Sequence, residues 1–93
     1  MPKITVELAS PLSNQIKWRK RDIEVDSLRH AVALLHASFP TELQNVYFDQ
    51  DPLKPKKFLL FLLNREDIRR KKGFDTPLQN GDLLQVALAL GGG

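Results

Sequence analysis

A single stretch with helical periodicity limits the fold of this chain more than any other feature. Its apolar positions, three and four residues apart, are Leu28, Ala31, Val32, Leu35 and Phe39. Apolar residues at this spacing line one face of a helix, and that face must be buried. We predict one helix over Ser27–Ser38, with Asp26 as its N-cap and Pro40 ending the run.

Period-two alternation predicts strands before this helix. Lys3–Ala9 alternates apolar and polar residues, as a half-buried strand does, and Ser10–Asn14 has the composition of a turn. A second strand is expected within Ile16–Val25. Its apolar phase changes near Lys20, which predicts a bulge or loop there and places the better-supported strand at Arg19–Val25.

The segments after the helix predict the rest of a sheet. The first are a short turn capped at Thr41–Leu43, an exposed loop over Asp49–Pro55, and a central strand over Phe58–Leu63 that is covered on both faces, or nearly so. They are followed by a turn at Asn64–Asp67, a short basic strand over Ile68–Lys71, a loop over Gly73–Asp82, and a last strand over Leu83–Leu90. We therefore expect an α+β fold in the order β-β-α-β-β-β, with a mixed four- to five-stranded sheet packed on one main helix. One domain over residues 1–90 is followed by a flexible glycine tail, 91–93.

Size and composition exclude several classes of function. A chain of 93 residues without cysteine has room for one core, and it has no disulfide framework, thiolate metal site or cysteine nucleophile. The longest apolar run, Phe58–Leu63, is far shorter than the ~18 residues of a membrane span. A net charge of +3 is mild. We expect a soluble cytoplasmic protein that does not contact a membrane.

The candidate catalytic and metal-binding residues have simpler structural explanations. Asp26, Ser27 and His30 are the residue types of a hydrolytic triad, but at a helix start they serve as caps and surface residues. His30 and His36 lie roughly 240° apart around the helix, so they cannot share a metal ion. We predict no catalytic residue, no metal site and no bound cofactor.

Basic residues gather in two clusters, one of which flanks Trp18. The clusters are Lys17, Arg19, Lys20, Arg21 and Arg69, Arg70, Lys71, Lys72. On strands, alternate side chains point to opposite faces, which would split each cluster. We interpret them as solvated strand edges, with an acidic partner as the alternative, and we expect no nucleic-acid partner. Trp18 is expected to cover part of the core.

The interpretation of the last three glycines depends on two motifs earlier in the sequence. Gly91–Gly93 alone are weak evidence, although an arm without Cβ atoms fits a narrow channel. Asn64–Arg69 and Thr76–Asp82, followed by the last strand and the glycines, resemble the ubiquitin-like sulfur carriers, the MoaD, ThiS and CysO group of β-grasp proteins. The spacing from Gly81-Asp82 to Gly93 matches the MoaD type without a gap. The part from Phe58 onward is most similar to CysO members.

This resemblance implies a ubiquitin-like β-grasp fold and a function for the chain end. The carboxylate of Gly93 would be adenylated with ATP by an E1-like activating enzyme of the MoeB or ThiF type. A sulfurtransferase or sulfide donor would convert it to a thiocarboxylate, and a downstream enzyme would accept the sulfur. Gly91, Gly92 and Gly93 would thread the activating enzyme. Most members end in two glycines after a bulkier residue, so the third glycine is a departure.

A second departure concerns the outer sheet face, through which MoaD-type carriers dock their activating enzyme by apolar residues. The corresponding positions here hold Glu7, Asp67 and Ala87, which are charged or small. If Leu59, Phe61 and Leu63 face the helix, alternate residues of the same strand face outward. The predicted partner interface is Leu60, Leu62, Ala87 and Leu90.

Two other functions compete with the sulfur carrier. The same activation chemistry would serve a ubiquitin-type modifier joined to lysines through Gly93. A non-covalent binding module would instead use the basic strands to bind an acidic partner or RNA, and its terminal glycines would be incidental. The receiving pathway stays open among molybdopterin, thiamine, cysteine or methionine synthesis and tRNA thiolation.

Overall fold

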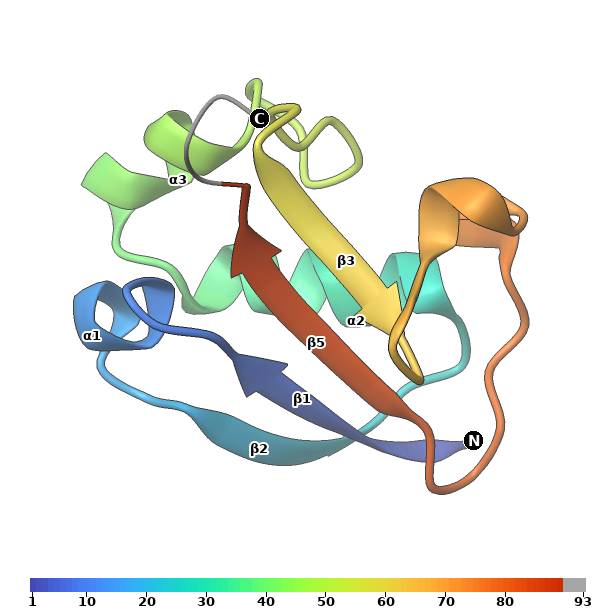
Figure 1. Cartoon of the computed structure of the whole chain (residues 1–93). Helices are drawn as coiled ribbons and strands as arrows, with labels where there is room; N and C mark the ends of the chain where they lie inside the picture. The colour runs from blue at the N-terminus through green and yellow to red at the C-terminus, as the bar shows by residue number, and fades with distance from the viewer. Residues whose placement is uncertain (90–93) are drawn as a thin grey trace.

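A computed structural model describes residues 1–89 of the chain as five strands with short and long helices between them (Figure 1). The strands are β1 Lys3–Leu8, β2 Lys20–Glu24, β3 Leu59–Leu63, β4 Glu66–Asp67 and β5 Leu83–Leu88. The helices are α1 Leu12–Ile16, α2 Leu28–Ser38 and α3 Thr41–Tyr47, with 3-10 turns η1 Ile68–Arg70 and η2 Gly73–Asp75. The expected α+β fold with one main helix is confirmed.

The strands form one mixed sheet in the order β2-β1-β5-β3-β4. β5 lies in the middle, parallel to β1 with Thr5 opposite Leu83, and antiparallel to β3 with Phe61 opposite Val86. β1 and β2 form an antiparallel pair. The strand that leads to the chain end is therefore paired along both edges.

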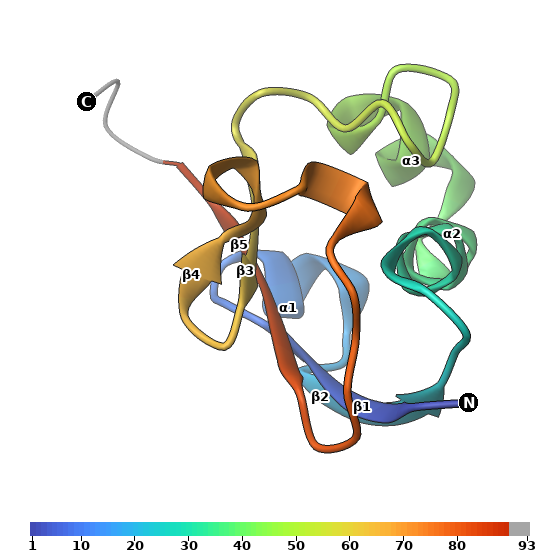
Figure 2. The ribbon, with the colours of Figure 1, turned by 90° about the vertical axis from the view of Figure 1, so that its right-hand side faces the viewer.

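The helices α2 and α3 cover one face of the sheet and leave the other face free of helices (Figure 2). On the covered face, alternate strand residues such as Ile4, Val6, Leu84 and Val86 are at most 2% exposed. They pack with the apolar stripe of α2, where the buried residues are Leu28, Ala31, Val32 and Leu35. This is the amphipathic packing that the helical spacing predicts.

The main helix begins one residue later than predicted, and its N-cap is Ser27. The Ser27 hydroxyl accepts a hydrogen bond from the His30 backbone N–H at 3.1 Å. The prediction of Asp26 as N-cap is wrong, although a carboxylate would also satisfy a free N–H there. Asp26 instead donates its own backbone N–H to His30 Nδ1 at 3.3 Å.

The predicted turn at Ser10–Asn14 is largely the helix α1, which the sequence analysis did not identify. Leu12 and Ile16 are buried, so α1 plugs one end of the core. Lys17 then adopts a left-handed conformation at φ 72° and ends the helix. The change of apolar phase therefore marks the end of a helix and a loop over residues 17–19, so of the predicted bulge or loop near Lys20 the loop is confirmed. Of the predicted Ile16–Val25 strand, only the later part is confirmed, as β2.

Three predictions after the main helix need correction. Ile68–Lys71 is not a strand, because the 3-10 turn η1 replaces it, and η2 interrupts the predicted loop after it. The residues of β3 alternate between buried and half-buried, so the strand is fully covered on one face and partly covered on the other. Phe58 precedes β3 and is 41% exposed. The turn capped at Thr41 is a longer helix than expected, α3.

Candidate functional site

The predicted tail, Gly91–Gly93, and Leu90 lie outside the described residues, but the structure fixes the point from which they continue. At that end of β5, Ala9 donates its N–H to Val86 O at 2.9 Å, and Ala89 donates its N–H to Phe58 O at 2.8 Å. The chain is thus held by β1 up to Val86 and by the start of β3 up to Ala89. Figure 1 shows this end of β5 beside the start of β3.

The two internal motifs that carry the family resemblance meet at the opposite end of β5. Asn64 donates Nδ2–H to Asp82 Oδ1 at 2.9 Å and accepts the Leu83 backbone N–H on Oδ1 at 2.9 Å. Asp82 Oδ2 accepts the Gln79 backbone N–H at 2.8 Å. We call Asn64 and Asp82 the clasp. It fixes the start of the central strand, so the motif has a structural role at a distance from the chain end.

The backbone conformation around the clasp explains its residue types. Asn64 and Arg65 have φ of 52° and 72°, the pattern of a two-residue hairpin turn in which both residues are left-handed. Asparagine tolerates this region better than most residues. Gly81, at φ 87°, adopts a conformation that favours glycine, and its N–H binds Lys3 O at 2.9 Å.

We expect Asn64→Ala to lower the free energy of unfolding by about 1–2 kcal/mol, because two side-chain hydrogen bonds are lost. Chemical denaturation measures this loss. Asn14→Ala is the matched control: its amide makes an exposed bond of 3.3 Å to Ser10 Oγ, and a change within about 0.5 kcal/mol is expected. Equal effects of the two substitutions would contradict the clasp.

The predicted interface residues Leu60, Leu62 and Ala87 share the sheet face that the helices leave uncovered. Leu60 lies opposite Ala87 in the β3–β5 ladder, and Leu62 lies opposite Gln85. All of them are half-buried, whereas the alternate residues Leu59, Phe61 and Leu63 are buried on the helix side. We call Leu60, Leu62 and Ala87 the outer patch. Its role as an interface stays a prediction.

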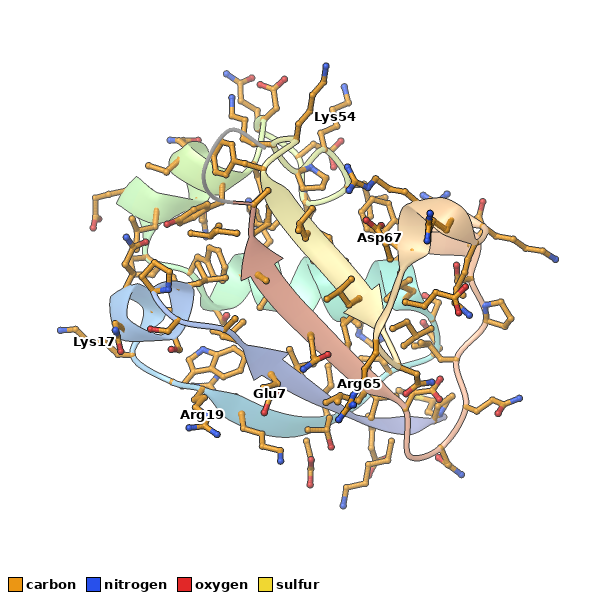
Figure 3. All side chains as sticks on the ribbon, in the orientation of Figure 1. Glu7, Lys17, Arg19, Lys54, Arg65 and Asp67 are labelled. Carbon is orange, nitrogen blue, oxygen red and sulfur yellow. The ribbon has the colours of Figure 1, made fainter. Side chains whose placement is uncertain are left out.

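Polar and charged side chains border the outer patch. Gln85 donates Nε2–H to Glu7 Oε1 at 2.9 Å. Figure 3 shows Glu7 and Arg65 over the lower part of this face and Asp67 at its right-hand margin. Glu7 and Asp67 are the charged departures noted from the sequence. An apolar centre with a polar border is the usual anatomy of a protein–protein contact surface.

Asp67 is held ionised by its neighbour. The Arg69 guanidinium donates to the Asp67 carboxylate at 2.7 Å and 3.1 Å, and the Arg69 backbone N–H donates to it at 2.9 Å. These bonds lower the pKa of the Asp67 carboxyl below its usual value of 3.8. Because this pKa is lower in the folded state, the pair stabilises the fold at every pH above about 3.8, and its contribution is lost as the pH falls from there through the lowered pKa.

The sequence analysis missed an exposed apolar surface beside the base of the tail. Phe58 is 41% exposed, and its carbonyl accepts the Ala89 N–H at 2.8 Å. The Phe58 ring contacts Tyr47 edge-on, with ring centroids 6.0 Å apart. The apolar run that contains Phe58 suggested only a buried strand. Its position directly after two lysines was the available signal that it lies at the protein surface.

The remaining candidate residues have structural contacts. His36 packs edge-on against Phe48 with centroids 4.8 Å apart. Among residues 1–89, no group of three or more His, Asp or Glu side chains could hold a metal ion. Trp18 is half-buried against the core with Arg21 over its ring at 4.4 Å, as its predicted covering role requires. No helix in this part of the chain is long and apolar enough to cross a membrane.

No protein-family model matches the sequence, and a search of curated proteins finds no match. Solved structures do match along nearly the whole chain. The small archaeal modifier protein 1 of Methanosarcina acetivorans is 19% identical, with a TM-score of 0.83, covering 100% of this chain and 98% of its own. Urm1 of Trypanosoma brucei is 25% identical, with a TM-score of 0.77 and coverages of 98% and 95%.

A third match is a chain of the BexX/CysO complex of Amycolatopsis orientalis, 18% identical, with a TM-score of 0.73 and coverages of 97% and 99%. The chain therefore has the ubiquitin-like β-grasp fold. The resemblance to the MoaD, ThiS and CysO group is confirmed at the level of the fold.

Proposed function

We propose that this protein is a sulfur carrier whose working group is the C-terminal carboxylate of Gly93. The observation that supports this function is the placement of β5. It is the central strand, and the chain is bonded on the β1 side up to Val86 and on the β3 side up to Ala89. The glycine-rich segment continues from this point, which lies beside the apolar surface around Phe58. Four residues span at most about 14 Å, enough to enter a partner's active site from a rigid base.

The chemistry takes place on that carboxylate and inside partner enzymes. An E1-like activating enzyme would transfer AMP from ATP to the carboxylate oxygen, with pyrophosphate as the leaving group. Hydrosulfide would then attack the acyl carbon, AMP would leave, and loss of a proton would give a thiocarboxylate. The chain contains no cysteine, so sulfur would be held only at Gly93. The protein would act as the substrate of enzymes, without catalytic residues of its own.

Intact-mass analysis tests this proposal. The chain is incubated with a MoeB- or ThiF-type activating enzyme, ATP and sulfide. We expect a mass increase equal to the replacement of one oxygen atom by one sulfur atom, and an acyl-adenylate when sulfide is omitted. The proposal would be contradicted if the MoeB- or ThiF-type enzyme from the same organism gave neither the acyl-adenylate nor the thiocarboxylate.

We also propose that the activating enzyme docks on the outer patch. Leu62→Asp places a charge at the centre of this patch, where its desolvation opposes docking. We expect kcat/KM for adenylation to fall by about 30-fold, which corresponds to a loss of about 2 kcal/mol. Pyrophosphate release at several concentrations of the carrier measures this effect.

Leu34→Asp is the control for this experiment. Leu34 is 43% exposed on α2, on the helix side of the sheet, so the same substitution there should leave kcat/KM within about twofold. Docking by the helix side would be indicated if Leu34→Asp impaired adenylation and Leu62→Asp did not.

A second candidate function is a modifier joined to lysines of other proteins. The structural match to a small archaeal modifier protein at a TM-score of 0.83 favours considering it. Activation of the carboxylate is common to both functions. Isopeptide adducts of Gly93 with target lysines in cells, found by mass spectrometry, would support the modifier.

A further inference from the structure

The charge of this chain is unevenly distributed along its sequence. Residues 54–72 contain eight of the fourteen basic side chains and two of the eleven acidic ones, a formal charge of +6, while the rest of the chain carries −3. Both acidic residues of this segment are paired inside it. Asp67 binds Arg69 at 2.7 Å, and Glu66 binds Lys71 at 3.4 Å. The other six basic side chains of the segment therefore have no acidic partner within it.

A groove of about 240 Å³ opens inside this basic segment, beside β3. Its lining includes the basic residues Lys56, Lys57 and Arg69, the acidic Asp67 that is paired with Arg69, and the apolar residues Leu59, Phe61 and Phe74. The rings of Phe61 and Phe74 meet edge-on, with centroids 5.8 Å apart. Lys56 is fixed by its backbone N–H, which donates to Tyr47 O at 2.8 Å, and by its carbonyl, which accepts the Leu59 N–H at 3.0 Å. The wall of the groove is thus well anchored.

The groove adjoins an incomplete strand edge. β4 pairs only with Leu62 and Leu63 of β3. In the β3–β5 ladder, Phe58 O and the Asn64 N–H bond toward β5, so the backbone groups of the alternate residues point to the other edge. The Leu59 N–H is already bonded to Lys56 O, so the backbone groups that this edge presents on the groove side are the Leu59 carbonyl and the Phe61 N–H. Within residues 1–89 these two groups have no strand partner there.

We propose that this groove binds an extended acidic peptide segment of a partner protein, which adds to the free edge of β3. A peptide backbone supplies both donors and acceptors for such an edge. Its acidic side chains would complement Lys56 and Lys57, and its apolar side chains would contact Phe74. This is an interaction surface separate from the outer patch.

Other occupants fit less well. A second copy of the chain would bring two segments of charge +6 together. Nucleic acid offers phosphate oxygens that only accept hydrogen bonds, so it would leave carbonyl groups of the edge unpaired. The other sheet edge, β2, alternates Lys20, Asp22 and Glu24 along its sequence, and such mixed charge discourages pairing with a partner strand.

An NMR titration of the full ¹⁵N-labelled chain tests the proposal with the peptide acetyl-Glu-Val-Asp-Val-Asp-Val-Glu-amide. We expect the largest shift changes at the amides of Leu59, Phe61 and Gly73. We also expect the Kd to rise about tenfold between about 0.05 M and 0.5 M salt, because charge pairs are screened. The variant Lys56→Glu/Lys57→Glu should weaken binding by about tenfold or more. Lys57→Glu alone, at an exposed position, should weaken it to a smaller degree.

The matched control is Arg19→Glu/Lys20→Glu, the same change of charge at the β2 edge. Figure 3 shows Arg19 on the opposite side of the molecule from Lys54, which belongs to the basic segment. This control should bind like the natural chain. A peptide with the same sequence and N-methylated valines should bind at least about tenfold more weakly, because its backbone cannot pair with the edge.

Three results would overturn the proposal. They are shift changes centred on β2, equal binding by the N-methylated peptide, and tighter binding of an oligouridylate than of the peptide at the same residues. The first would place the site elsewhere, the second would show attraction by charge alone, and the third would show a nucleic-acid surface.

Discussion

Removal of Gly92 and Gly93 is expected to reduce adenylation by about a hundredfold or more, the largest functional effect we predict. The truncation would withdraw the terminal carboxylate by about 7 Å, and misplacement by even 1 Å can cost about a hundredfold in rate. Pyrophosphate release with the activating enzyme measures the loss. The buried core lies within residues 1–89, so the free energy of unfolding should change by less than about 0.5 kcal/mol.

The control is a chain of full length with a carboxamide in place of the Gly93 carboxylate. It separates the effect of a shorter chain from the effect of losing the carboxylate. It can extend as far as the natural chain but lacks the oxygen that would accept AMP. We expect it to be inactive and to compete with the natural chain for the enzyme. Adenylation of the truncated chain at a normal rate would show that Gly93 is not the working group.

The largest effect on stability is expected from Leu84→Ala, with a loss of about 2–5 kcal/mol in the free energy of unfolding. Leu84 is fully buried in β5, so the substitution leaves a cavity between the central strand and the helix layer. Urea denaturation followed by circular dichroism measures this loss. For a domain of this size, such a loss can be a large part of the total stability.

Gln85→Ala on the same strand is the matched control. Gln85 points to the outer face and bonds Glu7, so its loss should cost about 1 kcal/mol or less. Adenylation of Leu84→Ala at a temperature where it is folded should stay within about twofold of the natural chain, because Leu84 faces the core. If Leu84→Ala cost less than Gln85→Ala, the assignment of the two faces of β5 would be wrong.

The sequence predicted the elements whose periodicity is long and regular. The helix around Leu28–Ser38 and the strands at both ends of the chain were located from spacing alone, because each must bury one face in a repeating pattern. Periodicity does not determine the order of the strands in the sheet. The sequence analysis therefore made no prediction of it, because the pairing of β1 with β5 joins residues that are far apart in the chain.

The errors share a physical cause, which is that short elements carry too few residues to show a period. α1 offers only Leu12 and Ile16 as buried positions, and Pro11 before it indicates a turn equally well. The 3-10 turn η1 contains a single buried residue, Ile68, which fits a strand or a turn. The bond between Asn64 and Asp82 is also invisible in sequence, because their proximity depends on the completed fold.

For the candidate site, the sequence identified the outer patch correctly as one face of the sheet, since alternation along β3 determines it. It did not identify the exposed Phe58 or the groove beside β3. Both depend on where β3 begins and on how short β4 is, and the composition of an apolar run does not determine such boundaries.

The position of β5 has a consequence for the order of assembly during synthesis. β5 follows the other four strands in the chain, yet it lies between β1 and β3. Without it, the β1–β2 hairpin and the β3–β4 hairpin share no hydrogen-bonded edge. Until residues 83–89 have left the ribosome, the nascent chain can therefore form the two hairpins but cannot join them into one sheet. The insertion that joins them also positions the base of the glycine arm, so a nascent chain can offer that arm to a partner only when its fold is complete.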